Sequence, residues 1–244
     1  MIGLDLGSTR AKMVRVADGA VVVRREVQSP RWRELLEGLD PAEPVATTGY
    51  FRKQVPGARS ITELTAARWG VAALAPEAEV IIDVGGQDTK VQDLRTNRFV
   101  LNDKCSAGTG AFLELVASYF GVPVEDLGRL HAEAEAPAEI NSTCAVFAMS
   151  EMVSQLVGGR SRADVVAGMH RAFARRISEL VPSSGRVVLI GGGARNTGLR
   201  SELERILGAE VEVPKHPEYV NALGAVEYAS GFMPVDGPPT ERLS

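Results

Sequence analysis

Residues 80–88 read Val80-Ile81-Ile82-Asp83-Val84-Gly85-Gly86-Gln87-Asp88, an apolar run that ends in an aspartate and a glycine-rich loop. A short apolar run bounded by turn residues is typical of a buried β-strand, and glycines let the chain turn sharply after it. Residues 90–94 are then expected to return as a second strand. The same pattern opens the chain, where Asp5-Leu6-Gly7-Ser8-Thr9 leads from a strand at 2–6 to one at 12–16. The two aspartates, at positions 5 and 83, lie 78 residues apart, which predicts two related lobes rather than a tandem array of repeats.

Both loops have the composition of a phosphate site. Their glycines bring bare backbone N–H groups against an anion, and the hydroxyls of Ser8 and Thr9 add donors. An aspartate at the end of each strand, Asp5 or Asp83, can hold Mg²⁺ through water, because magnesium keeps much of its hydration shell. Either loop alone is weak evidence, since Asp-x-Gly at a strand end is usually a plain hairpin turn.

A third strand, at 187–190, ends in Gly191-Gly192-Gly193-Ala194-Arg195-Asn196. These glycines would let an adenine ring or a ribose lie against the backbone; the alternative is a simple turn in which Asn196 caps the next helix. The segment nearly matches the dinucleotide fingerprint, but Asn196 replaces the third glycine and too little chain follows for a Rossmann fold. No Gly-x-x-x-x-Gly-Lys-[Ser/Thr] occurs, which excludes a P-loop.

The composition is that of an ordinary globular protein, with 45% hydrophobic and 24% charged residues among 244. Its 27 basic and 31 acidic residues give a formal charge of −4, so a nucleic acid is not an expected partner. The longest apolar runs are far shorter than the roughly 18 residues of a membrane-spanning helix. A charge at Asp5 falls where the apolar core of a signal peptide would lie. We therefore expect no membrane segment and a cytoplasmic location.

The pattern after the first strands is mostly helical. We expect helices at about 62–74, 112–120, 145–157, 163–181, 197–207 and 223–229. Lobe I is predicted to span 1–76 with the first phosphate loop. Lobe II is predicted to span 77–219 with the second loop, both cysteines and the triple-glycine segment. A C-terminal helix at about 220–232 can return to lobe I, and 233–244 reads as a tail rich in Pro and Gly.

Two cysteines, Cys105 and Cys144, are too few for a disulfide scaffold. Each precedes a predicted helix, and helix N-termini stabilise anions, so either thiol can serve as a metal ligand. An isolated cysteine is more often a small buried hydrophobic residue, and position alone leaves both readings open. Two cysteines cannot ligate an iron–sulfur cluster that needs four, but a two-fold dimer supplies four.

In this order, the two aspartate–glycine loops and the triple-glycine strand end resemble the phosphate-1, phosphate-2 and adenosine motifs of the sugar kinase/Hsp70/actin superfamily. The resemblance implies an α/β fold of the actin-like, ribonuclease H-like type. In that fold two lobes of mixed sheet and helices close on ATP and Mg²⁺ in the cleft between them.

The segments around the cysteines resemble one particular family within this superfamily. Residues 102–110, Asn-Asp-Lys-Cys-Ser-Ala-Gly-Thr-Gly, and 142–151, Ser-Thr-Cys-Ala-Val-Phe-Ala-Met-Ser-Glu, look like the two signature segments of the BadF/BadG/BcrA/BcrD ATPase family. The likeness runs from residue 1 to about 230. The best-understood members activate 2-hydroxyacyl-CoA dehydratases, and subunits of benzoyl-CoA reductase are relatives. The resemblance implies an ATPase coupled to electron transfer, with ferredoxin or flavodoxin as donor and an iron–sulfur dehydratase or reductase as acceptor.

The same resemblance implies residue roles. Cys105 and Cys144 match the two cysteines by which such a homodimer holds one 4Fe–4S cluster between its subunits. Asp5 and Asp83 are placed near Mg²⁺, and Gln87 is expected to orient the attacking water. The remaining matches are expected to bind ATP: Gly7, Ser8, Thr9, Lys12, Gly85, Gly86, Asp88, Gly192, Gly193 and Asn196.

The chain departs from the family pattern at two notable positions. Ala111 stands where an arginine is expected, and Asn221 stands where a glycine is expected. Asparagine tolerates a left-handed backbone better than most residues, so a turn there can survive. Two alternatives to the activator reading stay open: a cluster-free small-molecule kinase of the same fold, and a nucleotide-gated interaction module. The kinase predicts a phosphorylated product and no iron; the module predicts ATP-dependent partner binding without redox chemistry.

Overall fold

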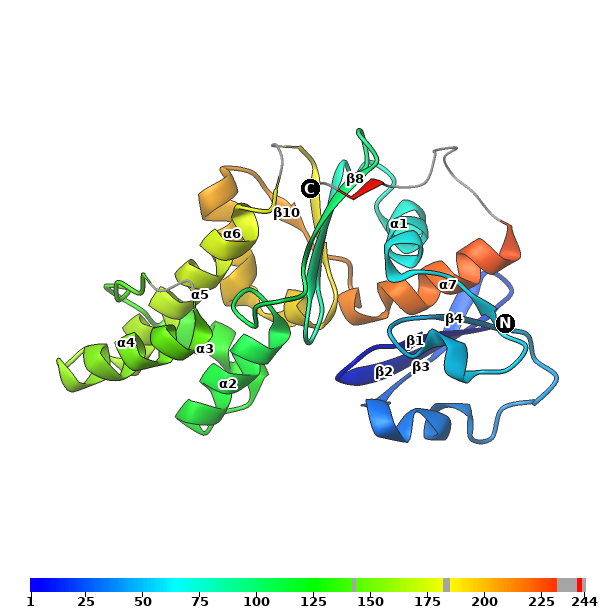
Figure 1. The fold of residues 1–244 in the computed structure, drawn as a ribbon, viewed down its shortest axis with the longest axis horizontal. Coiled ribbons are helices and arrows are strands. Elements are labelled where there is room, and N and C mark those ends of the chain that lie inside the picture. Colours follow the sequence, from blue (N-terminus) through cyan, green and yellow to red (C-terminus); the bar gives the residue numbers. More distant parts are fainter. Residues whose placement is uncertain (142–143, 182–184, 232–240, 243–244) are drawn as a thin grey trace.

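Each strand–loop–strand unit lies at the centre of its own sheet in the computed structural model, which describes residues 1–141, 144–181, 185–231 and 241–242 (Figure 1). In the first sheet, β1 (Ile2–Leu6) pairs antiparallel with β2 (Arg10–Ala17) and parallel with β4 (Val45–Thr48). The described strands of this sheet run in the order β3-β2-β1-β4-β5, with β3 at Ala20–Gln28 and β5 at Arg59–Ser60. All five residues of β1 are buried, as expected for a central strand, and Asp5 is the one charged residue among them.

The second sheet repeats this arrangement. Its central strand β6 (Val80–Val84) pairs antiparallel with β7 (Thr89–Asp93) and parallel with β9 (Val187–Ile190). The described strands run in the order β10-β9-β6-β7-β8-β11, with β8 at Arg98–Asn102, β10 at Val211–Glu212 and β11 at Glu241–Arg242. In both sheets the central strand is followed by its antiparallel neighbour, while its parallel neighbour comes from farther along the chain.

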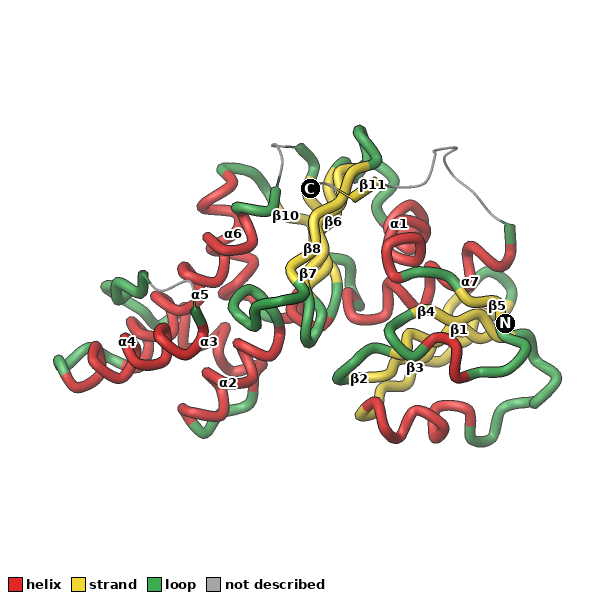
Figure 2. The backbone as a smooth tube through the Cα atoms, viewed as in Figure 1, coloured by secondary structure: helices red, strands yellow, loops and turns green. Residues whose placement is uncertain are grey.

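Helices cover the second sheet on the side away from the first (Figure 1, Figure 2). They are α2 (Gly110–Phe120), α3 (Leu127–Ala132), α4 (Ala145–Val157), α5 (Arg162–Ser178) and α6 (Thr197–Leu207). The core between them and the sheet joins Val84 and Leu189 of the strands to Phe112 and Phe173 of the helices. Short 3₁₀ helices lie between these elements, at Ser29–Leu36, Arg52–Gln54, Val124–Asp126, Gly192–Arg195 and Pro217–Tyr219.

Two helices, α1 (Glu63–Leu74) and α7 (Val220–Ser230), lie between the sheets (Figure 1). One side of α1 packs on the second sheet, where Ala67 and Val71 contact Ile81. The other helix, α7, packs against α1 and against β1 of the first sheet. Small residues permit these close crossings: a Cβ atom on Gly224 would overlap the backbone of Ala66.

The two mixed sheets thus form two lobes, with α1 and α7 between them. The predicted tail at 233–244 lies outside the described residues, apart from 241–242, which pair with β8 as β11. Within the described ranges, no helix combines the length and the apolar character that crossing a membrane would require.

Candidate functional site

A cleft of about 480 Å³ lies between the two lobes, where both glycine-rich loops and the end of β9 meet. The structure brings all the predicted nucleotide and magnesium residues to its walls: Asp5, Gly7, Ser8, Thr9, Lys12, Asp83, Gly85, Gly86, Gln87, Asp88, Gly192, Gly193 and Asn196. Residues that the sequence analysis does not select also line it, among them Tyr50, Glu63, Lys90 and Asn221. Cys105 and Cys144 are described but do not line the cleft.

The two glycine-rich loops touch each other across the cleft. A Cβ atom on Gly86 would overlap the hydroxyl of Thr9 and lie 2.8 Å from the Cβ of Thr9. A Cβ atom on Gly85 would lie 2.6 Å from Oδ1 of Asp88. Both approaches are closer than real Cβ contacts allow, so a side chain at position 85 would displace the Asp88 carboxylate and one at position 86 would displace Thr9.

Each strand-end aspartate faces a lysine on the returning strand. Asp5 is in register with Lys12, and Asp83 is in register with Lys90. Nζ of Lys12 lies 3.7 Å from Oδ2 of Asp5, while Nζ of Lys90 lies 2.7 Å from Oδ1 of Asp88. Lys90 is not among the residues predicted from the sequence, although it repeats the position of Lys12, seven residues after a strand-end aspartate. The cleft therefore receives a lysine from each of the two strand–loop–strand units, Lys90 buried and Lys12 half-buried.

Glu63 is a carboxyl group of the cleft that the sequence alone does not single out. It is the first residue of α1, directly after the N-cap Thr62, and its Oε1 lies 3.5 Å from Nζ of Lys90. Burial raises the pKa of Glu63 to about 7, although the charge of Lys90 opposes this shift. A carboxyl group with a pKa near neutrality can accept and release a proton at physiological pH. Glu63 is therefore a candidate proton acceptor.

The strand-end aspartates have the chemistry of a magnesium site. Both are buried, and burial raises the pKa of Asp5 against the opposing charge of Lys12. Oδ1 of Asp5 has no hydrogen-bond partner among the described residues. A buried acceptor without a donor is unfavourable, and water held by Mg²⁺ is a suitable donor.

The number of protein ligands also fits magnesium. No group of three or more potential metal-ligating side chains gathers in the described ranges. Mg²⁺ usually keeps several waters and shares the phosphates of its substrate, so one or two carboxylates are sufficient. The pair Asp5 and Asp83 thus fits a hydrated magnesium ion rather than a metal caged by protein.

The segment after β9 is both a helix cap and a wall of the cleft. Gly191 has a φ of +86°, which favours glycine, and a Cβ atom on Gly193 would overlap Val84. Oδ1 of Asn196 accepts a hydrogen bond from the N–H of Leu199 at 3.0 Å and caps α6. Nδ2 of Asn196 has no partner in the part of the chain that the structure describes. The capping interpretation is therefore correct, and the amide still has a donor to offer a ligand.

A substitution at Gly192 tests whether this wall of the cleft binds the nucleotide. A Cβ atom there would meet none of the described atoms within 4 Å, so the fold itself does not require glycine at this position. Gly192→Val is expected to leave the melting temperature of the nucleotide-free protein unchanged. It should weaken binding of the ATP analogue ADPNP by about 10- to 100-fold, because a lost contact in a binding pocket typically costs about 1–3 kcal/mol. Differential scanning fluorimetry and calorimetric titration measure the two effects. Unchanged ADPNP affinity would place the nucleotide elsewhere.

The two cysteines lie outside the cleft in different local structures. Cys144 is the N-cap residue of α4. Cys105 lies five residues before α2, whose N-cap is Thr109, so the expectation that it sits at a helix N-terminus is wrong. A separate turn intervenes, in which the N–H of Thr109 donates to the carbonyl of Ser106 at 3.0 Å. Both thiols are half-buried, and no disulfide links them.

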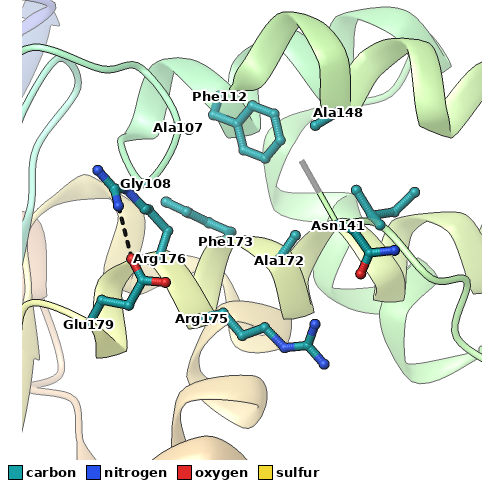
Figure 3. Close-up of a pocket in the computed structure, with 11 residues that line it drawn as sticks. Ala107, Gly108, Phe112, Asn141, Ala148, Ala172, Phe173, Arg175, Arg176 and Glu179 are labelled. Carbon is teal, nitrogen blue, oxygen red and sulfur yellow. Dashed lines mark hydrogen bonds and ion pairs between the residues drawn. The ribbon is translucent and has the colours of Figure 1, made fainter. Parts of the chain in front are cut away.

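A small pocket lies between the segments that carry the cysteines (Figure 3). Gly108 of the Cys105 turn lines it, and Asn141 and Ala148 line it from either side of Cys144. The rings of Phe112 and Phe173 form part of its wall, with centroids 5.9 Å apart in an edge-to-face arrangement. A shift of α2 therefore changes the space beside both cysteine segments.

Backbone hydrogen bonds join the second phosphate loop to the helix that follows Cys105. At the start of α2, the N–H groups of Gly110 and Ala111 donate to the carbonyls of Gly85 and Gly86, both at 2.8 Å. The expected arginine at position 111 is absent, but this contact uses only the backbone. Because the loop and the helix are bonded directly, a displacement of one displaces the other.

Comparison with known proteins agrees with this arrangement. The model of the BadF/BadG/BcrA/BcrD ATPase family matches residues 32–229. The chain belongs to this family. Its relatives include the 2-hydroxyisocaproyl-CoA dehydratase activator of Clostridioides difficile, 39% identical and covering 93% of this chain and 94% of the relative. The (R)-2-hydroxyglutaryl-CoA dehydratase activating ATPase of Acidaminococcus fermentans is 37% identical and covers 93% of this chain and 96% of the relative.

A solved structure of this family shows the same fold. The activator of 2-hydroxyisocaproyl-CoA dehydratase from Clostridium difficile, determined with bound ADPNP, superposes with a TM-score of 0.86 at 36% identity. The match covers 97% of this chain and 99% of that one. The predicted two-lobed, actin-like fold with a cleft between the lobes is confirmed.

Proposed function

We propose that this protein is an ATP-hydrolysing activator that passes a low-potential electron to an iron–sulfur acyl-CoA enzyme, either a 2-hydroxyacyl-CoA dehydratase or a benzoyl-CoA reductase-type partner. Ferredoxin or flavodoxin would supply the electron. Family membership and the activities named for the relatives support this function. The observation that carries it is the pair of hydrogen bonds from α2 to the second phosphate loop, because they connect the cleft with the cysteine segment.

ATP would bind with its phosphates between the two glycine-rich loops. The phosphates would accept hydrogen bonds from the backbone N–H groups of both loops and from the hydroxyls of Ser8 and Thr9. The ammonium group of Lys12 would add positive charge beside them. Asp5 and Asp83 would hold Mg²⁺ through water, and the bound ion supplies neutralisation of phosphate charge. Gly85, Gly86 and Asp88 shape the second loop, and Gly192, Gly193 and Asn196 form the adenosine wall.

Two side chains are suited to act on the attacking water. Gln87 is exposed within the cleft, where its amide can orient the water by hydrogen bonds. Glu63 is more deeply placed and can accept the proton that the water loses as its oxygen bonds to the γ-phosphorus. The bond from that phosphorus to the bridging oxygen breaks at the same time, and ADP and phosphate leave.

The pH dependence of ATP hydrolysis tests the role of Glu63. Since only the ionised carboxylate accepts a proton, kcat/KM is expected to rise as pH increases through about 7 and to level off above it. Glu63→Gln is expected to lower kcat/KM by about 10²- to 10⁴-fold at pH 8, the usual contribution of a general base. The variant should also lose this rise, while the ionisation of ATP itself remains in both profiles. Parallel profiles for the two proteins would contradict the assignment.

The cysteines fit a cluster shared between two subunits. In the described ranges no third side chain joins either thiol to complete a metal-ligand group, so one chain cannot hold a four-thiolate cluster. Both thiols are partly exposed, and Cys144 lies at the start of α4. Cys105 and Cys144 of a homodimer would hold one 4Fe–4S cluster, which supplies one-electron transfer when bound.

The surface of α4 supports the homodimer. Directly after Cys144, Val146 is 69% exposed and Phe147 is 65% exposed, and farther along the helix Val157 is 84% exposed. Large apolar side chains gathered on one exposed helix are typical of an interaction site. Covering them with a second copy would bring the two Cys144 segments toward each other.

The turn that carries Cys105 is held by the second sheet. The hydroxyl of Thr89 donates to the carbonyl of Gly108 at 2.5 Å. Nδ2 of Asn102 donates to the carbonyls of Cys105 and Ala107, at 3.1 and 2.9 Å. The turn is therefore anchored to β7 and β8, the strands that continue from the second phosphate loop. Closure of the lobes on ATP would change the position of this turn, and with it the environment of the thiol.

The function is tested by assembling the reaction without oxygen. The protein is mixed with reduced ferredoxin, ATP and an iron–sulfur 2-hydroxyacyl-CoA dehydratase, and dehydration of the acyl-CoA is followed. We expect activation that requires ATP and is not supported by ADPNP, because hydrolysis drives the transfer. A phosphorylated small molecule as product, with no activation, would favour a kinase of the same fold instead.

A further inference from the structure

A buried hydrogen bond joins α7 to the aspartate that precedes the second phosphate loop. Nδ2 of Asn221, the second residue of α7, donates to Oδ2 of Asp83 at 2.9 Å. The two residues are 7% and 2% exposed. A hydrogen bond to a carboxylate is roughly twice as strong as one between neutral groups, and the bond fixes the orientation of the Asp83 carboxylate.

Asn221 lies where α7 passes from one sheet to the other. Val220, just before it, belongs to the apolar core on the second sheet, together with Ile81 and Val188. Ala222, just after it, lies so close to β1 that a Cβ atom on Gly3 would overlap the Ala222 backbone. One turn later, Gly224 is pressed against Ala66 of α1. Asp83 is part of the second sheet through β6. The hydrogen bond therefore joins the phosphate strand of the second sheet to a helix that packs on both sheets.

The remaining polar atom of Asn221 also points to a ligand. Because Nδ2 donates to Asp83, the free amide atom is the acceptor Oδ1, and it has no partner among the residues described. Asn221 lines the cleft, as does Asp5, whose Oδ1 is likewise unpartnered. Phosphate oxygens only accept hydrogen bonds once ionised, so they cannot satisfy either atom. Water bound to a cation can donate to both.

We infer that Asn221 is a positioning residue, which orients Asp83 and accepts a hydrogen bond from the hydration shell of the nucleotide's magnesium ion. This inference rests on the proposed ATPase function and deepens it. It makes the affinity for Mg²⁺ depend on the contact between the first turn of α7 and Asp83. An asparagine at this position thus has a function beyond tolerance of the local backbone.

The test is a calorimetric titration of ADPNP binding at a series of Mg²⁺ concentrations. Asn221→Ala is expected to raise the Mg²⁺ concentration for half-maximal binding by about 10- to 100-fold, the effect of losing a hydrogen bond to a charged group. Binding of ADPNP in the presence of a chelator should be unchanged. Alanine favours a helix more than asparagine does, so the variant should fold, and thermal unfolding checks this.

Two further variants separate positioning from a structural effect. Val226→Ala, on the same helix but packed on β1, should lower the melting temperature and leave the Mg²⁺ dependence unchanged. In an Asp83→Asn background, Asn221→Ala should cause little additional change, because the two residues act as one unit. Additive effects, or an equal Mg²⁺ shift in Val226→Ala, would overturn the inference.

The same titration distinguishes failure of this inference from failure of the proposed ATPase function. Wild-type protein that binds ADPNP with Mg²⁺, together with an Asn221→Ala variant of identical Mg²⁺ dependence, overturns the inference and leaves the ATPase function intact. Wild-type ADPNP binding that does not respond to Mg²⁺ also overturns the inference alone, whereas wild-type protein that fails to bind ADPNP even with Mg²⁺ overturns the proposed function as well.

Discussion

Gly86→Ala is expected to lower kcat for ATP hydrolysis by about 10²-fold or more, while the protein remains folded. The new Cβ atom would overlap the hydroxyl of Thr9 on the opposite loop, so the two phosphate loops could no longer meet. These loops belong to different lobes, and a small opening of the cleft relieves the overlap without disturbing either core. Misplacement of reacting groups by about 1 Å is enough for a loss of this size. Steady-state hydrolysis and thermal unfolding measure the two effects.

A second-site change shows whether the loss is steric. Thr9→Gly removes the atoms that the new methyl group would meet, so Gly86→Ala/Thr9→Gly should hydrolyse ATP faster than Gly86→Ala alone. Gly158→Ala, at the end of α4 and outside the cleft, serves as the matched glycine control and should retain normal kcat. Wild-type kcat in Gly86→Ala would show that hydrolysis does not need the loops in contact.

Cys144→Ala is expected to abolish the iron–sulfur cluster and all activation of the partner enzyme, while ADPNP binding stays within about twofold of wild type. In the proposed cluster this thiol would supply a ligand, and no group of three metal-ligating side chains in the described ranges offers a substitute. The cleft contains neither cysteine. Iron analysis and calorimetry on the same preparation measure both properties. Cys105→Ala should give the same result.

The two cysteine variants distinguish a shared cluster from separate structural roles. If Cys144→Ala lost ADPNP binding together with iron, the cysteine and nucleotide sites would not be independent. If either variant kept its full iron content, that cysteine would not be a ligand. Cys105 and Cys144 would then be the packed thiols that an isolated cysteine usually is.

Much of the fold follows from local pattern. The apolar runs at 2–6, 80–84 and 187–190 are the strands β1, β6 and β9, because each is buried on both faces of a sheet. The edge strand β3 was harder to predict, since Ala20–Gln28 is only partly buried and carries several charges. Its signal lies in the turn before it, where Asp18 and Gly19 have positive φ and form the hairpin sequence Asp-Gly.

The residues of the candidate site also differ in how well the sequence predicts them. The glycine loops had a signal in their composition, and the structure brings both of them to the cleft. Lys90 had a sequence signal in its repeat of the Asp5–Lys12 spacing. Glu63 had none, and Asn221 was notable only as a departure from the family pattern. Both reach the cleft from the first turns of α1 and α7, and only the packing of those helices between the lobes places them there.

The most direct test of this account is the iron and acid-labile sulfide content of protein purified without oxygen, with an absorption spectrum before and after exposure to air. We expect about four irons and four sulfides per dimer, the content of one 4Fe–4S cluster, lost in air and absent from Cys144→Ala. A colourless, iron-free protein that hydrolyses ATP, and stays free of iron after reconstitution with iron and sulfide, would contradict it.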